Sequence, residues 1–375
     1  MKKSLNLRIF IKAFIIAGAI GTIGDLNAQD PIFSQFYNNP LYYNPGNVGL
    51  NPGMRMRFNY RDQWSGLPVD FKTYNFSMDI AERNIPGSGG LGLIALSDRA
   101  GTGMIKTSIL GLATAVRVPL QENMIAQVGI MASFVQKNID MSQLVFADQL
   151  SARYGNIYQT AFEAPADQKV TYPDFTIGGV YRFSELGMSF ANIQGTLGAA
   201  MHHVFTPNES FLGLSAPLPR KLVVHADLVF EIDQSEGNFY NRSRNPKSFK
   251  FNPGFNLEKQ GDFSTFSIGL NVLKSSIYTG LWFRNQTFDF VQSNDLMITA
   301  GLYLPFNKGS RLKLMYSYDF VLTELATAAG ASHEITIAFE FDDFNLFSGG
   351  GGGGRSFGSS GRGGRSYHEM ECCPF

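Results

Sequence analysis

The chain has 375 residues, of which 44% are hydrophobic and 17% charged, with 31 basic residues against 31 acidic ones. A formal net charge of zero gives no electrostatic reason to expect nucleic acid as a partner. The only cysteines, Cys372 and Cys373, are adjacent, which excludes a disulfide framework. The composition is unusual in its 40 glycines and 33 phenylalanines.

Residues 1–28 are expected to be a signal peptide. A basic start is followed by an apolar run at residues 13–20, which is far shorter than the roughly 20 residues of a membrane helix. Ala28 offers a small residue for cleavage, and no cysteine lies nearby to carry a lipid. The mature chain is therefore expected to be exported and to begin at Gln29.

Residues 29–53 combine aromatic residues with Asn and Pro and lack the alternation of a strand. We expect this segment to pack as a cap against the periplasmic mouth of the sheet predicted next. The alternative is a loosely ordered lead-in.

From Met54 onward the chain repeats an alternating segment of about ten residues and then a turn rich in Gly, Asn, Asp, Ser or Pro. A soluble sandwich and a membrane barrel both bury such alternating faces, but soluble strands cluster near 5–6 residues, whereas membrane-spanning strands need roughly 9–11. The segments fit the longer class and carry aromatic residues at their ends, as membrane barrels do. The pattern therefore predicts an all-β fold, a transmembrane antiparallel β-barrel over residues 54–341.

Counting the segments gives about 14 strands, within a range of 12 to 16. With an even number both ends lie in the periplasm, where the turns should be short, and the polar stretch 233–246 is an exception to this rule. The predicted strands lie near residues 54–61, 71–80, 90–98, 104–118, 123–137, 173–183, 187–204, 219–232, 247–258, 262–273, 276–287, 294–305, 310–321 and 333–341.

A barrel of this size is narrower than the open porins, so its lumen should be narrow or occupied. The predicted inward residues have both signs, and mutual ion pairs are favoured over an ion-selective filter. They include Arg55, Arg57, Asp79, Arg182, Lys221, Asp227, Lys250, Glu258, Lys313, Asp319 and Glu340.

The strand pattern stops after Phe341. Residues 342–366 form a Gly/Ser/Arg-rich stretch that cannot bury enough apolar area to fold and is expected to be a disordered linker. The tail motif at 367–375 then presents Cys372, Cys373 and Phe375 as possible partner-binding residues. The two cysteines leave zinc binding and intermolecular disulfides open, although the spacing of a structural zinc site is missing.

The candidate chemical sites are weak. His202, His203, His225 and Asp227 come from neighbouring strands, but adjacent residues of a strand point to opposite faces, so structural histidines are favoured over a metal site. No nucleophile elbow or convincing Ser, His and carboxylate set is present. We therefore expect no enzyme activity, no metal and no cofactor.

Six stretches of the sequence form an ordered set of motifs, at residues 29–46, 60–64, 202–211, 280–285, 316–319 and 330–335. They occur in the order found in the PorP/SprF family of Bacteroidetes outer-membrane proteins, and the chain resembles that family from Gln29 to about Phe341. The resemblance implies a barrel of the cell outer membrane that is associated with the type IX secretion system and, in gliding species, with adhesins.

The resulting hypothesis is a non-enzymatic component that supports secretion or surface anchoring of a partner such as an adhesin. Its expected partners are type IX secretion components in the periplasm or outer membrane, the secreted adhesin and outer-membrane lipid. Arg61, Asp62 and Trp64 lie at the first outer turn, where they either bind a partner or, as favoured here, pin that loop. The alternative function is a channel for small or hydrophobic solutes, and a hydrolase is the third class.

Overall fold

The computed structural model describes residues 30–344, except for 70, 83–84, 102–104, 122, 152, 163–167, 189–190, 212, 233–248, 287–293, 308, 323–328 and 343. The predicted signal peptide 1–28, the exceptional stretch 233–246, the tail motif 367–375 and nearly all of the linker 342–366 lie outside the described residues.

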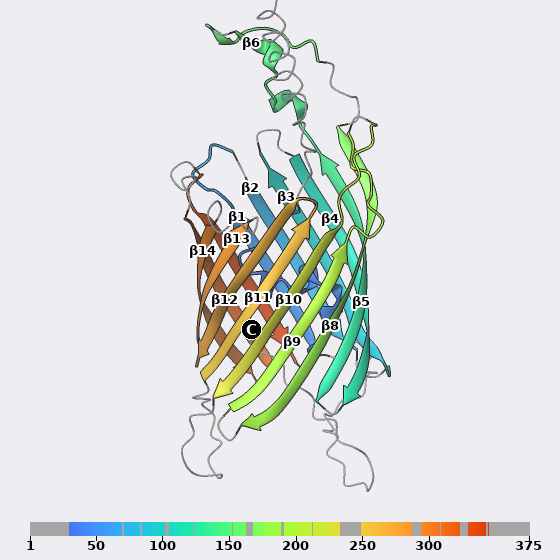
Figure 1. The fold of residues 1–375 in the computed structure, drawn as a ribbon, viewed down its shortest axis with the longest axis vertical. Coiled ribbons are helices and arrows are strands. Elements are labelled where there is room, and N and C mark those ends of the chain that lie inside the picture. The colour runs from blue at the N-terminus through green and yellow to red at the C-terminus, as the bar shows by residue number, and fades with distance from the viewer. Residues whose placement is uncertain are drawn as a thin grey trace, which may run out of the picture.

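The fold is a closed antiparallel barrel in which β1 pairs with β16, so the described sheet has no free edge (Figure 1). Every barrel strand lies within a few residues of its predicted position, because the alternation and the turn residues mark it locally. The barrel strands are β1 (Met54–Asp62), β2 (Phe71–Ala81), β3 (Ser88–Ala100), β4 (Ile105–Gln121), β5 (Met124–Asn138), β8 (Lys169–Met188), β9 (Ala191–His202), β10 (Lys221–Ile232), β11 (Phe249–Gln260), β12 (Phe263–Lys274), β13 (Ile277–Gln286), β14 (Asn294–Asn307), β15 (Ser310–Val321) and β16 (Ser332–Phe341).

Alternation places polar residues in the lumen and apolar residues on the outside. In β1, Arg55 and Arg61 are 1% and 2% exposed, whereas Phe58 is 50% exposed. The same rule makes Leu110 and Leu112 of β4 more than half exposed on the outer surface. This inverted distribution is stable only where lipid covers the outside of the sheet. No helix among the described residues is long and apolar enough to cross a membrane.

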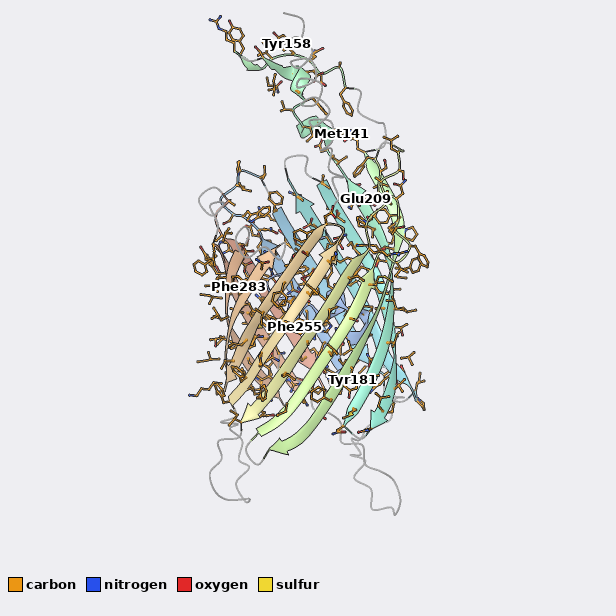
Figure 2. All side chains as sticks on the ribbon, viewed as in Figure 1. Met141, Tyr158, Tyr181, Glu209, Phe255 and Phe283 are labelled. Carbon is orange, nitrogen blue, oxygen red and sulfur yellow. The ribbon has the colours of Figure 1, made fainter. Side chains whose placement is uncertain are left out.

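We call the end of the barrel at which β1 starts and β16 stops the periplasmic end, and the opposite end the outer end. The longest described connection joins β5 to β8 at the outer end. It contains two 3-10 helices, η3 (Met141–Gln143) and η4 (Ala147–Gln149), and the hairpin of β6 (Leu150–Ser151) and β7 (Gly155–Asn156). Met141 and Tyr158 mark this connection above the rim (Figure 2).

The segment before β1 lies inside the barrel. It contains η1 (Phe36–Asn38), α2 (Pro40–Tyr43) and η2 (Pro45–Asn47), and we call residues 30–53 the plug. The plug was expected to cap the periplasmic mouth, but it instead runs through the lumen from the outer end to the start of β1, as the blue segment within the barrel shows (Figure 1). Its location differs because its polar side chains complement the polar inner wall, and the next subsection gives these contacts.

Candidate functional site: the plugged lumen

The plug begins at the outer end in an ionic contact. His203, the residue after β9, lies between two carboxylates: its Nε2 is 2.8 Å from Asp30 Oδ2 and its Nδ1 is 3.0 Å from Asp174 Oδ2. The backbone N–H of Asp30 also donates to Gln260 Oε1 at 3.1 Å. These contacts hold the first described residue of the plug directly to the end of β9 and to β11, and through His203 to β8.

The charge state of this contact is set by its neighbours. Burial lowers the pKa of His203, but the charges and hydrogen bonds of Asp30 and Asp174 outweigh it and raise the pKa from 6.5 to about 10. Burial raises the pKa of Asp30, and the charge of His203 reverses this and holds it below its usual range. The contact is therefore an ion pair at neutral pH.

This pair predicts a stability change at high pH. Because the folded pKa of His203 is raised, its contribution is complete below about pH 6.5 and is lost as the pH rises through about 10. The unfolding temperature of the purified barrel should therefore fall between pH 6.5 and 10. In His203→Gln the fall should be smaller across the same window. An equal fall in both proteins would assign the pH dependence to other groups.

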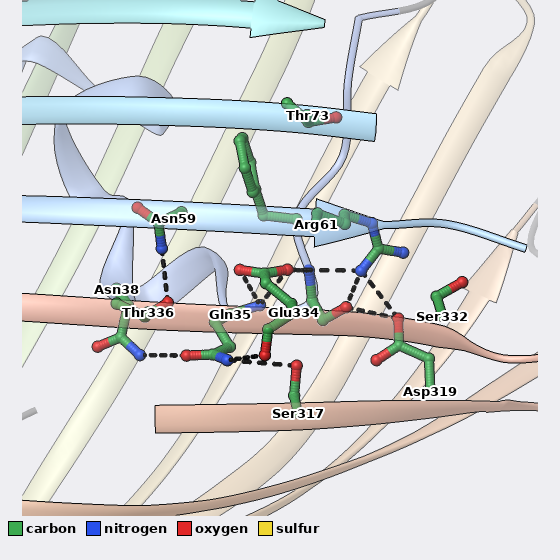
Figure 3. A network of polar contacts seen from close by, with 12 residues as sticks. Gln35, Asn38, Asn59, Arg61, Thr73, Ser317, Asp319, Ser332, Glu334 and Thr336 are labelled. Atoms are coloured by element: carbon green, nitrogen blue, oxygen red, sulfur yellow. Dashed lines mark hydrogen bonds and ion pairs between the residues drawn. The ribbon is translucent and has the colours of Figure 1, made fainter. Parts of the chain in front are cut away.

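The second contact centres on Arg61 of β1. Its Nη1 is 3.0 Å from Asp319 Oδ2 of β15 and 3.4 Å from Glu334 Oε2 of β16, and it also donates to the Ser34 hydroxyl of the plug (Figure 3). All these side chains are buried. Glu334 in turn accepts from the backbone N–H of Ser34 at 2.6 Å. One guanidinium thus joins three strands that flank the barrel seam to the plug.

The plug backbone is also bonded to side chains of the wall. Gln127 donates from Nε2 to the carbonyl oxygens of Gly46 at 2.8 Å and Val48 at 2.6 Å, and Arg284 donates to that of Phe33 at 2.7 Å. These hydrogen bonds satisfy carbonyl groups of the plug, which is not part of a sheet or a long helix that would otherwise pair them. The plug can therefore occupy a closed lumen without leaving these carbonyls unbonded.

A patch of the wall without side chains receives the turn at 44–46. An added Cβ at Gly129 of β5 would lie 2.2 Å from the Pro45 carbonyl oxygen, and one at Gly178 of β8 would lie 2.2 Å from Asn44 Oδ1. From this position the Asn44 amide donates to the Gly179 carbonyl at 3.0 Å. We call Gly129 and Gly178 the glycine seat, because the plug approaches the wall this closely only where side chains are missing.

Aromatic packing fixes the middle of the plug. The ring of Phe36 meets Trp282 of β13 edge-on at 4.8 Å, and Tyr37 stacks on the same indole at 5.4 Å. Trp282 is held by a bond from Nε1 to Asn271 Oδ1 of 2.9 Å. Apolar residues of the plug, such as Phe33 and Leu41, belong to the same buried cluster.

The wall also pairs its own charges at both ends of the barrel. Toward the periplasmic end, Arg57 lies 2.9 Å from Asp79 and Lys313 lies 2.9 Å from Glu340. At the outer end, Lys221 lies 2.8 Å from Glu258. The expected mutual pairing of inward charges is thus observed. A cavity of about 100 Å³, lined by both polar and apolar side chains, remains between the plug and the wall near Asp227 and Asn256. Its size and its polar groups suit a few water molecules.

The three histidines singled out in the sequence are divided among different contacts. His202 Nε2 is 3.1 Å from the Tyr43 carbonyl oxygen, His225 Nε2 is 3.2 Å from Asn44 Nδ2, and His203 holds Asp30. In the part of the chain that the structure describes, no group of three or more His, Cys, Asp or Glu residues could hold a metal. The histidines bind the plug.

Of the possible partner-binding residues, Arg61 is turned into the lumen. Asp62 accepts a 3.5 Å hydrogen bond from Tyr60. The ring of Trp64 packs edge-on against Phe71 at 5.2 Å, and the backbone N–H of Trp64 donates to Ser332 Oγ. Cys372, Cys373 and Phe375 lie outside the described residues. Ser34, Gln35 and Asn44 were not singled out from the sequence, although the density of Asn and aromatic residues in 29–53 was noted there.

A family model described as type IX secretion system membrane protein PorP/SprF matches residues 25–339. No curated protein matches the chain.

Solved structures similar to the chain are barrels. They include a FadL homologue of Pseudomonas aeruginosa, with 10% identity over 85% of this chain and 95% of that chain and a TM-score of 0.40. The toluene transporter TbuX of Ralstonia pickettii has 10% identity over 81% of this chain and 93% of that chain and a TM-score of 0.39. At these values the likeness concerns the fold alone.

Proposed function

Because the chain belongs to the PorP/SprF family of type IX secretion system membrane proteins, we propose that it is a non-enzymatic outer-membrane component that supports secretion or surface anchoring of a partner protein such as an adhesin. Its localisation in the outer membrane follows from the family and the barrel fold. The proposed partners are type IX secretion components in the periplasm or outer membrane and the exported protein itself.

The observation that carries this proposal is the plug. Residues 30–53 occupy the lumen and are held by ion pairs at the outer end, by the glycine seat and by the aromatic cluster at Trp282. A barrel whose lumen is filled by its own chain suits attachment better than solute flow. This favours the anchoring role over the alternative, a channel for small or hydrophobic solutes.

The two functions differ in conductance. The wild-type barrel, purified and reconstituted in a planar bilayer, is expected to show no steady conductance. The reason is that the plug fills the lumen and is held to the wall by buried polar contacts on several sides. A large and steady conductance would support the channel and count against the anchor.

The anchoring role is tested in cells. A strain lacking the barrel should lose particular proteins from its surface, while their messenger RNA levels stay the same. If the surface proteins are unchanged, the proposed function fails. We also propose that the tail with Cys372, Cys373 and Phe375 docks to a partner. A strain in which the barrel is truncated before residue 348 tests this. Unchanged surface proteins in that strain would show that the tail does not contribute. Asp62 and Trp64 can be replaced by alanine in the same assay.

A further inference from the structure

The cavity between the plug and the wall contains two opposite charges that do not touch each other. Arg182 of β8 and Asp227 of β10 lie directly opposite Thr196 of β9, one on each side, and all three line the cavity. Two strand spacings of about 4.8 Å separate the charged residues by about 10 Å along this row. The described residues show no ion pair for either side chain. Asp227 instead accepts a long hydrogen bond from Asn252 at 3.4 Å, and Arg182 Nη1 donates to Asn51 Oδ1 of the plug at 2.6 Å.

A polar atom without a partner lies near each of these charges. Arg182 is 7% exposed, and its Nε is buried without a hydrogen-bond partner among the described residues. Asn256 of β11 also lines the cavity, is 1% exposed and is a diagonal neighbour of Asp227. Its Nδ2 donates to Glu258 Oε1 at 2.9 Å, whereas its Oδ1 is buried without a partner in the described part of the chain. The cavity thus offers a donor at the cationic end and an acceptor at the anionic end, and leaving either unbonded costs free energy.

The indole of Trp282 reaches the anionic end of the cavity. Gly254 of β11 lies directly opposite Asp227, and a Cβ built at Gly254 would be 3.3 Å from Trp282 Cη2 and 3.3 Å from Asp227 Cβ. Because this position has no side chain, the indole lies beside Asp227. An aromatic ring next to a carboxylate favours a cation at that place.

The size and the charges of the cavity together define its ligand. Its volume of about 100 Å³ is smaller than the roughly 150 Å³ of an engineered cavity that binds benzene. A ligand with a single charge would leave the opposite end of the row without a partner. We propose that the cavity binds a small zwitterionic amino acid, of the size of glycine or alanine. Its ammonium group lies at Asp227 and Asn256 Oδ1, and its carboxylate lies at Arg182 Nε and the Thr196 hydroxyl.

The bound amino acid also stabilises the plug. Tyr43 and Asn47 of the plug line the cavity opposite the row, and Asn51 of the plug is bonded to Arg182. The site is therefore complete only while the plug occupies the lumen. A ligand that binds only this state raises the stability of the closed barrel.

Binding is measured on the purified full chain in an uncharged maltoside detergent, because a zwitterionic headgroup would compete with the ligand. Glycine and alanine should bind saturably in isothermal titration calorimetry and should raise the unfolding temperature. Methylamine and acetate each carry one of the two charges. Each should bind at least about tenfold more weakly than glycine, because one charge-assisted contact is missing.

The variant Asp227→Asn tests the anionic end. Asparagine has the same shape and Asp227 has no ion pair to lose among the described residues, so the variant should give the gel shift of a folded barrel. Glycine should bind it at least about tenfold more weakly than the wild type. Glu231→Gln is the matched control, because it removes a carboxylate from the same inward face of β10 at a position that does not line the cavity. Glycine should bind this control as it binds the wild type.

The variant Thr196→Val tests the other end at nearly constant volume, and it supplies the same comparison if Asp227→Asn does not fold. It should bind glycine more weakly than the wild type and bind methylamine equally. Three results would overturn the proposal: no saturable binding of glycine or alanine to the wild type at millimolar concentration, glycine binding by both cavity variants equal to that of the wild type, or methylamine binding as tight as that of glycine. None of them bears on the anchoring role, which is measured by the surface proteins of the barrel-deficient strain.

Discussion

Replacing Gly129 by alanine is expected to push the plug off the barrel wall and to make a silent barrel conduct ions. The new Cβ would lie 2.2 Å from the Pro45 carbonyl oxygen and 2.8 Å from the Gly46 nitrogen, so backbone must move. Overpacking of this kind costs about 1–3 kcal/mol. The expected results in a planar bilayer are frequent openings, together with a lower unfolding temperature.

Gly179→Ala is the matched control. Gly179 is adjacent to Gly178 of the glycine seat, but a Cβ at Gly179 would meet its nearest atom, the Gln127 carbonyl oxygen, at an ordinary 3.6 Å. This variant should stay closed and keep the wild-type unfolding temperature. If both variants remain silent and equally stable, the close approach at the seat does not hold the plug.

Replacing Arg61 by methionine is expected to give the largest loss of stability among single substitutions in the lumen. The change leaves the buried carboxylates of Asp319 and Glu334 together without the guanidinium that lies 3.0 and 3.4 Å from them. Removing one partner of a buried ion pair costs about 3–5 kcal/mol. Urea unfolding in detergent, followed by the gel shift of the folded barrel, measures this loss.

Two further variants test whether the uncompensated buried carboxylates cause this loss of stability. Adding Glu334→Gln to Arg61→Met removes one uncompensated carboxylate and should recover part of the loss. Lys250→Gln breaks the Lys250–Glu231 pair, whose side chains are 19% and 37% exposed, so it should cost only about 0–1 kcal/mol. A loss for Lys250→Gln equal to that for Arg61→Met would contradict the role of burial.

The strands could be predicted from the sequence because their information is local. In β15 the alternation from Arg311 to Phe320 marks the face of the strand, the predicted range is 310–321, and the structure gives Ser310–Val321. The pairing of inward charges also followed, since the two-residue period of a strand assigns Lys313 and Glu340 to the lumen before any neighbour is known. The family motifs further predicted the outer-membrane localisation and the association with the type IX secretion system.

The site depended on tertiary structure. Asn44 and Gly129 are 85 positions apart in the printed sequence, and only closure of the barrel brings the turn at 44–46 against a glycine of β5. The sequence contains 40 glycines, and their number does not show which of them receive the plug and which form turns. The sequence places Arg61 next to an outer turn, and only the structure shows that its side chain contacts Asp319 of β15 and Glu334 of β16. The sequence by itself determined an alternating, membrane-spanning β-barrel, because side-chain periodicity is read residue by residue. Whether its lumen is open or filled was decided by contacts between distant segments, because complementarity between plug and wall exists only once the barrel has closed.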